Sequence, residues 1–354
     1  MSTKRFFAAA AMFAVSALTL AGCAVSTVAG SGEAGGDTVT YTGWGGVSQE
    51  SATMAWLEPY QEETGIEVVQ DSPTDYSKIQ QMAEAGNSTW DVVQIGADIG
   101  IYDGDFLEPI DCEIVACDDF DGEFAAEKYG VPLFVFAIVM TYNTDSVGSD
   151  APTTWADYYD TEKYPGTRAM YGNGGEMNGA YEAALVADGV AQDDLYPLDV
   201  DRALEKMSTI KDDIIFYTDF AECIRLVSSG EAVMGDCYSG RVQTAIAEGE
   251  PLGFSWSQQV QVSEYLVVPK GSAHVEEAMK LIAYISSSEN NGRFSEYMAY
   301  GPANPHAEVS AESEPNLPTA HILTGDDAPI FPDHEWYIEN VKDADRKLAE
   351  WKES

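Results

Sequence analysis

The sequence predicts an α/β fold, because short runs of β-branched and aromatic residues alternate with segments of helical periodicity. The clearest helix covers residues 272–287, where one apolar face recurs every three to four residues. Alternation of this kind is typical of layered α/β domains with mostly parallel sheets. The strand-like runs are VTYT (39–42), IEVV (66–69), DVVQIG (91–96), LFVFAIVMTYN (133–143), EAVMGDC (231–237) and EYLVVP (264–269).

The N-terminal segment predicts export. Residues 1–22 begin with basic residues, continue with an apolar run too short for a typical membrane span, and end in Leu-Ala-Gly directly before Cys23. This ending resembles a bacterial lipobox, so we expect a signal peptide over 1–22 and a lipid on Cys23; the alternative is a plain signal peptide that leaves a free thiol. Small residues over 23–36 indicate a flexible tether. The protein is then lipid-anchored on the outer face of the cell membrane, or periplasmic.

The length and the net charge of the chain indicate how many lobes it forms and which classes of binding partner are excluded. About 320 residues remain after the tether, enough for two lobes with separate cores. The net charge of −42 and the pI near 4.1 argue against nucleic acid and against anionic membrane surfaces, since both would repel the chain. The acidic excess is also typical of proteins adapted to salt, and the sequence leaves open whether it serves salt adaptation or function.

The cysteines fit an oxidising compartment, because four remain besides Cys23. Three pairings are possible. Their short separations favour Cys112 with Cys117, and Cys223 with Cys237, and the second pair flanks a segment that is expected to form a helix, a turn and a strand.

Metal, cofactor and enzyme chemistry are not expected. The chain has no CxxC, and His274, His306, His321 and His334 form no cluster with the spacing of metal ligands. It also lacks GxSxG, HExxH, P-loop and GxGxxG motifs. The sequence therefore favours a protein that is not an enzyme.

The loop after the first expected strand contains an unusual aromatic residue. In YTGWGGVSQE (41–50), Trp44 precedes two glycines, and we expect Ser48 to cap the following helix. Ligands of α/β folds bind beyond the carboxyl ends of strands, on loops such as this one. Trp44 is therefore a candidate wall of a binding cleft, with Gly45 and Gly46 allowing a close approach of the backbone.

Several segments in order resemble the extracellular solute-binding proteins of ABC importers, and within them the spermidine/putrescine-binding group. The similarity runs from about Asp37 to the C-terminus and is carried by TGIEVV (64–69), YGVPLFVFAIVMTYNTD (129–145), SGEAVMGDCYSGR (229–241), EYLVVPKGSAHVEEAMKLIAYI (264–285) and YGPANP (300–305), among others.

The resemblance implies a two-lobed periplasmic-binding-protein-like fold of type II, with a ligand cleft between lobes that close by a hinge. Lobe 1 is expected to contain 37–137 plus 262–305, and lobe 2 to contain 138–261 plus 306–354. The implied function is the substrate-binding component of an ABC importer, a monomer that delivers its ligand to the transmembrane permease subunits. A surface lipoprotein without a transport function is the less favoured alternative.

The spermidine/putrescine group implies a polyamine ligand, whose ammonium groups need carboxylates and whose methylene chain needs aromatic walls. Residues that match or fall near the group's ligand-binding positions are Trp44, Glu176, Tyr238, Glu264, Tyr300 and Trp336. Two further candidates are Asp98, on the loop after the third expected strand, and Asp219, where the group has small or aromatic residues. Acidic residues at three loop positions are weak evidence for a binding site in a chain with 60 Asp and Glu residues. Most of the nineteen tyrosines are expected in the hydrophobic core.

Departures from the group's pattern open a second interpretation. Val47 and Val262 replace aromatic residues, and Gly179 replaces an acid, which favours a shorter or modified amine. The glycine-rich segment GNGGEMNG (172–179) precedes an expected helix and offers backbone N–H groups to an anion. The alternative ligand is therefore a zwitterion, such as an amino acid derivative or an aminophosphonate.

Overall fold

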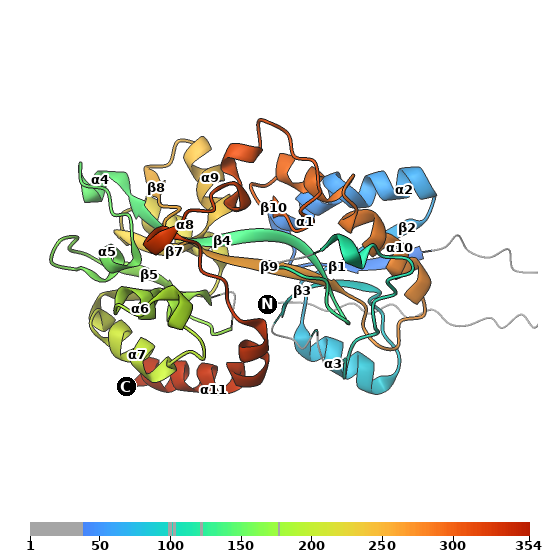
Figure 1. Ribbon diagram of the computed structural model, residues 1–354, viewed down its shortest axis with the longest axis horizontal. Coiled ribbons are helices and arrows are strands. Elements are labelled where there is room, and N and C mark those ends of the chain that lie inside the picture. Colours follow the sequence, from blue (N-terminus) through green and yellow to red (C-terminus); the bar gives the residue numbers. More distant parts are fainter. Residues whose placement is uncertain (1–37, 98–100, 102–103, 121–122, 176–177) are drawn as a thin grey trace, which may run out of the picture. The chain divides into compact units, whose positions relative to one another are not determined.

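The computed structural model describes residues 38–97, 101, 104–120, 123–175 and 178–354 (Figure 1). The signal peptide, the tether, Cys23, Asp98 and Glu176 therefore lie outside the described residues. In the described part of the chain, no helix is long and apolar enough to cross a membrane.

The centre of the fold is one sheet of ten strands in the order β2-β1-β3-β9-β4-β7-β5-β6, with β8 and β10 also paired to β4. All six predicted strands are present, and β5, β6, β8 and β10 are additional. The strands are β1 (Thr38–Thr42), β2 (Glu67–Asp71), β3 (Val92–Gly96), β4 (Val131–Asn143), β5 (Arg168–Tyr171), β6 (Ile214–Tyr217), β7 (Met234–Tyr238), β8 (Leu252–Phe254), β9 (Val260–Val267) and β10 (Gly301–Pro302).

The sheet is mixed, so the expectation of mostly parallel strands is wrong. Pairs β1–β2, β1–β3, β5–β6 and β5–β7 are parallel, whereas β9 and β4 pair antiparallel with each other and with β3 and β7. A buried strand is apolar whichever way it runs, so the hydrophobic pattern predicts the strand but not its direction.

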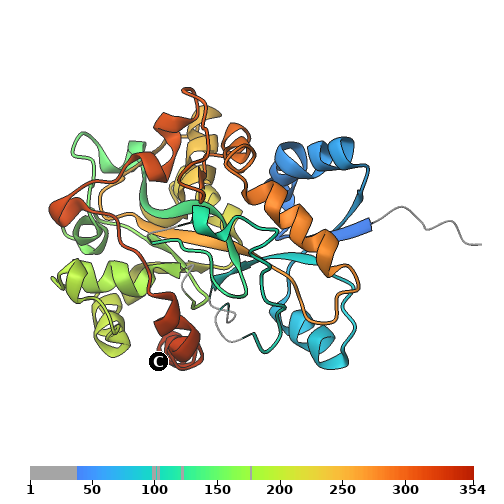
Figure 2. The same ribbon diagram turned by 45° about the vertical axis from the view of Figure 1, so that its right-hand side comes forward.

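Helices surround both ends of this sheet (Figures 1 and 2). The predicted helix over 272–287 is confirmed as α10, whose inward residues Ala278, Met279, Ile282 and Ile285 are fully buried. The helices are α1 (Gly46–Ala52), a π-helical turn (Thr53–Leu57), α2 (Glu58–Thr64), α3 (Tyr76–Ala85), α4 (Thr144–Val147), α5 (Trp155–Tyr159), α6 (Ala180–Ala187), α7 (Val200–Ser208), α8 (Phe220–Ser228), α9 (Ser239–Ala247), α10 (Val275–Ser286) and α11 (His334–Glu353).

The antiparallel pair β4–β9 joins the two ends of the sheet. β9 pairs with β3 through Glu264–Val267, and β4 pairs with β7 through Ile138–Tyr142. The lobe boundaries proposed from the sequence fall opposite each other on this pair, where Ala137 aligns with Gln261. Both strands are buried over almost their whole length, and each contributes residues to both proposed lobes.

Both favoured cysteine pairs are disulfides in the structure. Cys112–Cys117 closes a short loop, with Cα atoms 5.5 Å apart. Cys223–Cys237 joins α8 to β7 across a turn, with Cα atoms 5.7 Å apart, and both of its cysteines are buried.

Peptide mapping tests this connectivity. Digestion without reductant by a protease that cuts after glutamate, at Glu113 and Glu231 among other sites, is expected to release one peptide pair joined through Cys112–Cys117 and another joined through Cys223–Cys237, each of which separates on reduction. Four free thiols, or a crossed pairing between the two sites, would contradict the structure.

Candidate ligand-binding site

Four of the predicted ligand-binding residues meet at one small pocket: Trp44, Tyr238, Glu264 and Tyr300. The pocket has a volume of about 30 Å³, which is room for two or three water molecules. The other residues that line it are not among those predicted from the sequence to bind ligand: Ser48, Phe136, Phe220 and Arg241.

Trp44 reaches the pocket from the loop that follows β1. Gly45 and Gly46 both have positive φ, 82° and 59°, which explains why the tryptophan is followed by residues without side chains. The helix begins at Gly46 with Gly45 as N-cap, so the expected Ser48 cap is wrong. Ser48 lies inside the first turn instead, where it is buried and lines the pocket.

Glu264 carries the carboxylate of the pocket and is only 5% exposed. Its Oε2 accepts a hydrogen bond from the Trp44 indole Nε1 at 3.0 Å and another from Gln94 Nε2. Gln94 Oε1 accepts in turn from the Tyr41 hydroxyl at 2.9 Å. Burial, and then the charge of Glu264, raise the pKa of Tyr41, so this hydroxyl stays protonated and remains a donor. The chain of donors fixes the orientation of the carboxylate.

The neighbouring strand supplies an aromatic residue to the same face as Glu264. Phe134 aligns with Glu264 across the β4–β9 pair, and Phe136 follows two residues later, so the three side chains point to one side. The ring of Phe136 lies 5.4 Å from those of both Tyr238 and Tyr300, measured between centroids. The three rings form one continuous aromatic surface in the pocket.

Arg241 brings a positive charge to the pocket. It lies in the first turn of α9, and its Cζ is 5.9 Å from the centroid of the Phe220 ring. Burial raises the pKa of the Tyr300 hydroxyl, while the charge of Arg241 lowers it and that of Glu264 raises it. Opposite charges therefore act on the same pocket tyrosine.

A compositional signal for Arg241 is present in the sequence. The chain has 18 Lys and Arg residues against 60 Asp and Glu, so a basic residue near an expected ligand position is much more informative than an acidic one. Arg241 ends the segment CYSGR, three residues after Tyr238. Phe136 and Phe220 give no comparable signal, because aromatic residues are frequent in the core.

Two further candidates lie away from the pocket. Asp219 is exposed and caps α8, with its Oδ1 accepting from the backbone N–H of Ala221 at 2.8 Å. Trp336 packs against Tyr196 and Tyr337 and lines a separate hollow of about 470 Å³ beside α7 and α11.

The larger hollows offer less specific chemistry than the small pocket. Lys347 in the hollow of Trp336 already pairs with Asp201 at 2.8 Å. Another hollow, of about 510 Å³, lies against Val135 and Gln261, and its described charged residues are both acids, Glu123 and Glu314. Among the residues that the structure describes, no three His, Cys, Asp or Glu side chains could together hold a metal ion.

Comparison with known proteins identifies the family. A family model of bacterial extracellular solute-binding proteins matches residues 55–319. The chain belongs to this family. Its members are exported transport components rather than enzymes, and the α/β fold of the periplasmic-binding-protein type is confirmed by structural neighbours of this solute-binding protein.

Two relatives of the solute-binding protein are named for γ-aminobutyric acid (GABA), and a third is a complex with agropinic acid. The γ-aminobutyric acid (GABA)-binding protein of Pseudomonas aeruginosa is 29% identical over 352 residues, which is 95% of this chain and 96% of the relative. A solved GABA receptor is 35% identical with a TM-score of 0.82, covering 89% of this chain and 98% of the receptor. A binding protein of Agrobacterium tumefaciens in complex with agropinic acid is 30% identical with a TM-score of 0.77, and the match covers 90% of this chain and 99% of that protein.

The similarity to the spermidine/putrescine group is more distant. Spermidine/putrescine-binding periplasmic protein 1 of Haemophilus influenzae is 22% identical over 273 residues, covering 73% of this chain and 74% of the relative. The comparisons therefore favour the zwitterion alternative over the polyamine expected from the sequence.

A second buried carboxyl group lies on the strand that ends at the pocket. Asp236 on β7 is 4% exposed, and both its side-chain oxygens accept from the backbone N–H of Tyr171 at 3.1 Å. Burial raises the pKa of this carboxyl from 3.8 to about 8, against the opposing effect of the Tyr171 N–H.

The free energy of unfolding of the solute-binding protein should therefore depend on Asp236. Between pH 3.8 and about 8 the folded state holds a proton that the unfolded state has lost, so stability falls as pH rises through this window. Asp236→Asn removes this dependence, and the wild type should lose about 1.4 kcal/mol per pH unit relative to the variant. Urea unfolding of both proteins at pH 5 and pH 8 measures the difference; an equal change in both would contradict the assignment.

Proposed function

We propose that the protein captures a short zwitterion with an ammonium group at one end and a carboxylate at the other, such as GABA, and delivers it to the permease of an ABC importer. The observation that carries the proposal is that Glu264 and Arg241 line the same aromatic pocket. A free polyamine offers no anion to Arg241, whereas an amino acid offers a partner to both charges.

The ammonium end is assigned to Glu264. A charge-assisted hydrogen bond to this carboxylate replaces the water that the cation loses, and the face of Trp44 adds a cation–π contribution. Because Trp44 and Gln94 already donate to Oε2, the carboxylate needs no reorientation on binding.

The carboxylate end is assigned to Arg241. A guanidinium binds a carboxylate through two parallel hydrogen bonds, and the N-terminus of α9, where Arg241 lies, also favours an anion. The same charge would repel the second ammonium of putrescine.

The proposed lobes divide the site between them. Trp44, Phe136, Glu264 and Tyr300 belong to lobe 1 as bounded above, whereas Phe220, Tyr238 and Arg241 belong to lobe 2. A ligand with opposite charges at its ends would thus bridge the lobes and stabilise the closed state over the open one. The names of two relatives, both GABA binders, agree with a ligand of this class.

Calorimetry with one ligand and two truncated analogues tests this assignment. GABA should bind more tightly than n-butylamine, which lacks the carboxylate, and than butyrate, which lacks the ammonium. Glu264→Gln and Arg241→Gln should each weaken GABA binding by about 1.5 to 3 kcal/mol, or roughly ten- to a hundredfold, because each removes one charge-assisted contact. Arg241→Gln should leave n-butylamine binding unchanged or tighter.

Arg293→Gln is the matched control, because Arg293 also lies 5.9 Å from an aromatic ring, that of Tyr284, but does not line the pocket. This variant should bind GABA like the wild type. If GABA gives no heat while putrescine binds, and Arg241→Gln does not alter putrescine binding, the zwitterion assignment is wrong and the polyamine is the ligand.

Membrane attachment is proposed separately, from the Leu-Ala-Gly-Cys sequence at 20–23. Mass spectrometry of membrane-extracted protein should find a diacylglyceryl-modified Cys23 at the new N-terminus, and Cys23→Ser should release the protein from membranes. A mature N-terminus elsewhere without lipid would contradict the anchor.

A further inference from the structure

We propose that the disulfide Cys223–Cys237 is a positioning element of the ligand pocket: it fixes the wall that carries Phe220, Tyr238 and Arg241, so that ligand affinity depends on it and not stability alone. This inference rests on the proposed function for its ligand.

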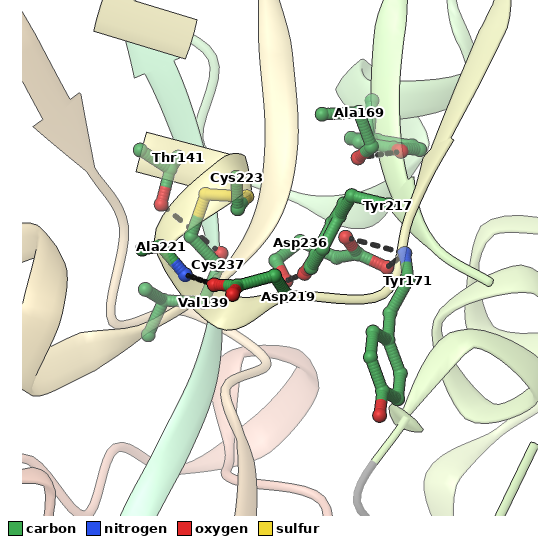
Figure 3. Close-up of a disulfide and its surroundings, with 11 residues drawn as sticks. Val139, Thr141, Ala169, Tyr171, Tyr217, Asp219, Ala221, Cys223, Asp236 and Cys237 are labelled. Atoms are coloured by element: carbon green, nitrogen blue, oxygen red, sulfur yellow. Dashed lines mark hydrogen bonds between the residues drawn. A yellow bond between two sulfur atoms is a disulfide. The ribbon is translucent and has the colours of Figure 1, made fainter. Parts of the chain in front are cut away.

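The disulfide lies directly behind this wall. Cys237 immediately precedes Tyr238 at the end of β7, and Cys223 lies in the first turn of α8, which begins at Phe220. Figure 3 shows the bond joining the helix to the strand beside Asp219 and Asp236. The rings of Phe220 and Tyr238, one from each element, meet with centroids 4.5 Å apart. The bond therefore sets the separation of the two elements that carry these rings.

Asp236, which precedes Cys237, connects the end of β7 to the neighbouring strands β5 and β6. The side chain of Asp236 accepts the N–H of Tyr171 at the end of β5, and its backbone oxygen accepts from the Tyr217 hydroxyl at 2.7 Å (Figure 3). β7 is thus tied to β5 and β6 at Asp236 and to α8 at Cys237. Tyr238 and α9 follow at once, so the position of Arg241 depends on these ties.

The surroundings leave the bond little room to move. Both cysteines are fully buried. A Cβ added to Gly235 would lie 2.9 Å from both Cys223 Sγ and Val227 Cγ2. Packing this tight transmits a displacement instead of absorbing it. Burial also keeps the sulfurs from thiols in solution, so the bond acts as a permanent brace instead of a redox switch.

The chain supplies its own control. Cys112–Cys117 is the other disulfide, with Cys112 exposed, and neither cysteine nor the loop between them lines the pocket. Removing this bond perturbs the protein through the same chemistry at a site without a role in the wall.

The experiment compares Cys223→Ala/Cys237→Ala with Cys112→Ala/Cys117→Ala in the exported protein, at a temperature where circular dichroism shows both folded. Hydrogen exchange without ligand should speed up at residues 238–241 in the first variant only. GABA affinity should fall roughly 2- to 30-fold in the first variant and stay unchanged in the second. The loss should be larger for GABA than for n-butylamine, because Arg241 holds the carboxylate.

Gly235→Ala provides a second test with the disulfide intact, since its methyl group presses on the sulfurs. Gly235→Ala should also weaken the binding of GABA more than that of n-butylamine. If the double cysteine variant does not fold, this variant alone tests the positioning role of the disulfide. GABA binding as tight as in the wild type, or an equal loss for both ligands, would overturn the inference. If the wild type itself does not bind GABA, the proposed function fails; unchanged exchange at 238–241 then overturns the positioning role as well, and faster exchange supports it.

Discussion

The antiparallel pairing of β4 with β9 is the constraint on which the rest of the structure depends. These strands bring together the sheet region around β1, β2 and β3 and the region around β5, β6 and β7. Their register puts Phe136 and Glu264 on one face, while the end of β7 and the loop after β1 place Tyr238 and Trp44 beside them. A slip of one residue would turn Glu264 to the opposite face and remove the carboxylate from the pocket.

A buried carboxylate is costly unless its hydrogen bonds are supplied by the protein. At Glu264 the cost is offset by a network that spans three adjacent strands, from Tyr41 on β1 through Gln94 on β3 to Glu264 on β9, with Trp44 donating from the loop. The aromatic residue expected to contact the ligand thus also orients the acid expected to contact it. For the proposed ligand, we expect affinity to come from these preorganised groups more than from the area of contact.

The charge of the whole chain and the charge of the pocket have different consequences. A net charge of −42 creates a field that attracts any cation and is screened by salt. A zwitterion has no net charge, so this field contributes little to its encounter with the protein. Selection of such a ligand therefore depends on the pair Glu264 and Arg241 at short range, and an acidic surface suited to salt is compatible with it.

The sequence by itself determined the α/β class, six of the strands, the main amphipathic helix and the favoured disulfide pairs, because these depend on local periodicity and short separations. Its resemblance to a known family also predicted Trp44, Tyr238, Glu264 and Tyr300, which do meet at one pocket. Only the tertiary structure decided the strand directions, the inclusion of Phe136, Phe220 and Arg241, and the placement of Asp219 and Trp336 outside. The physical reason is that a pocket is defined by contacts between residues far apart in the chain. Arg241 lies on helix α9 and Glu264 on strand β9, and no local sequence pattern indicates that they line the same pocket.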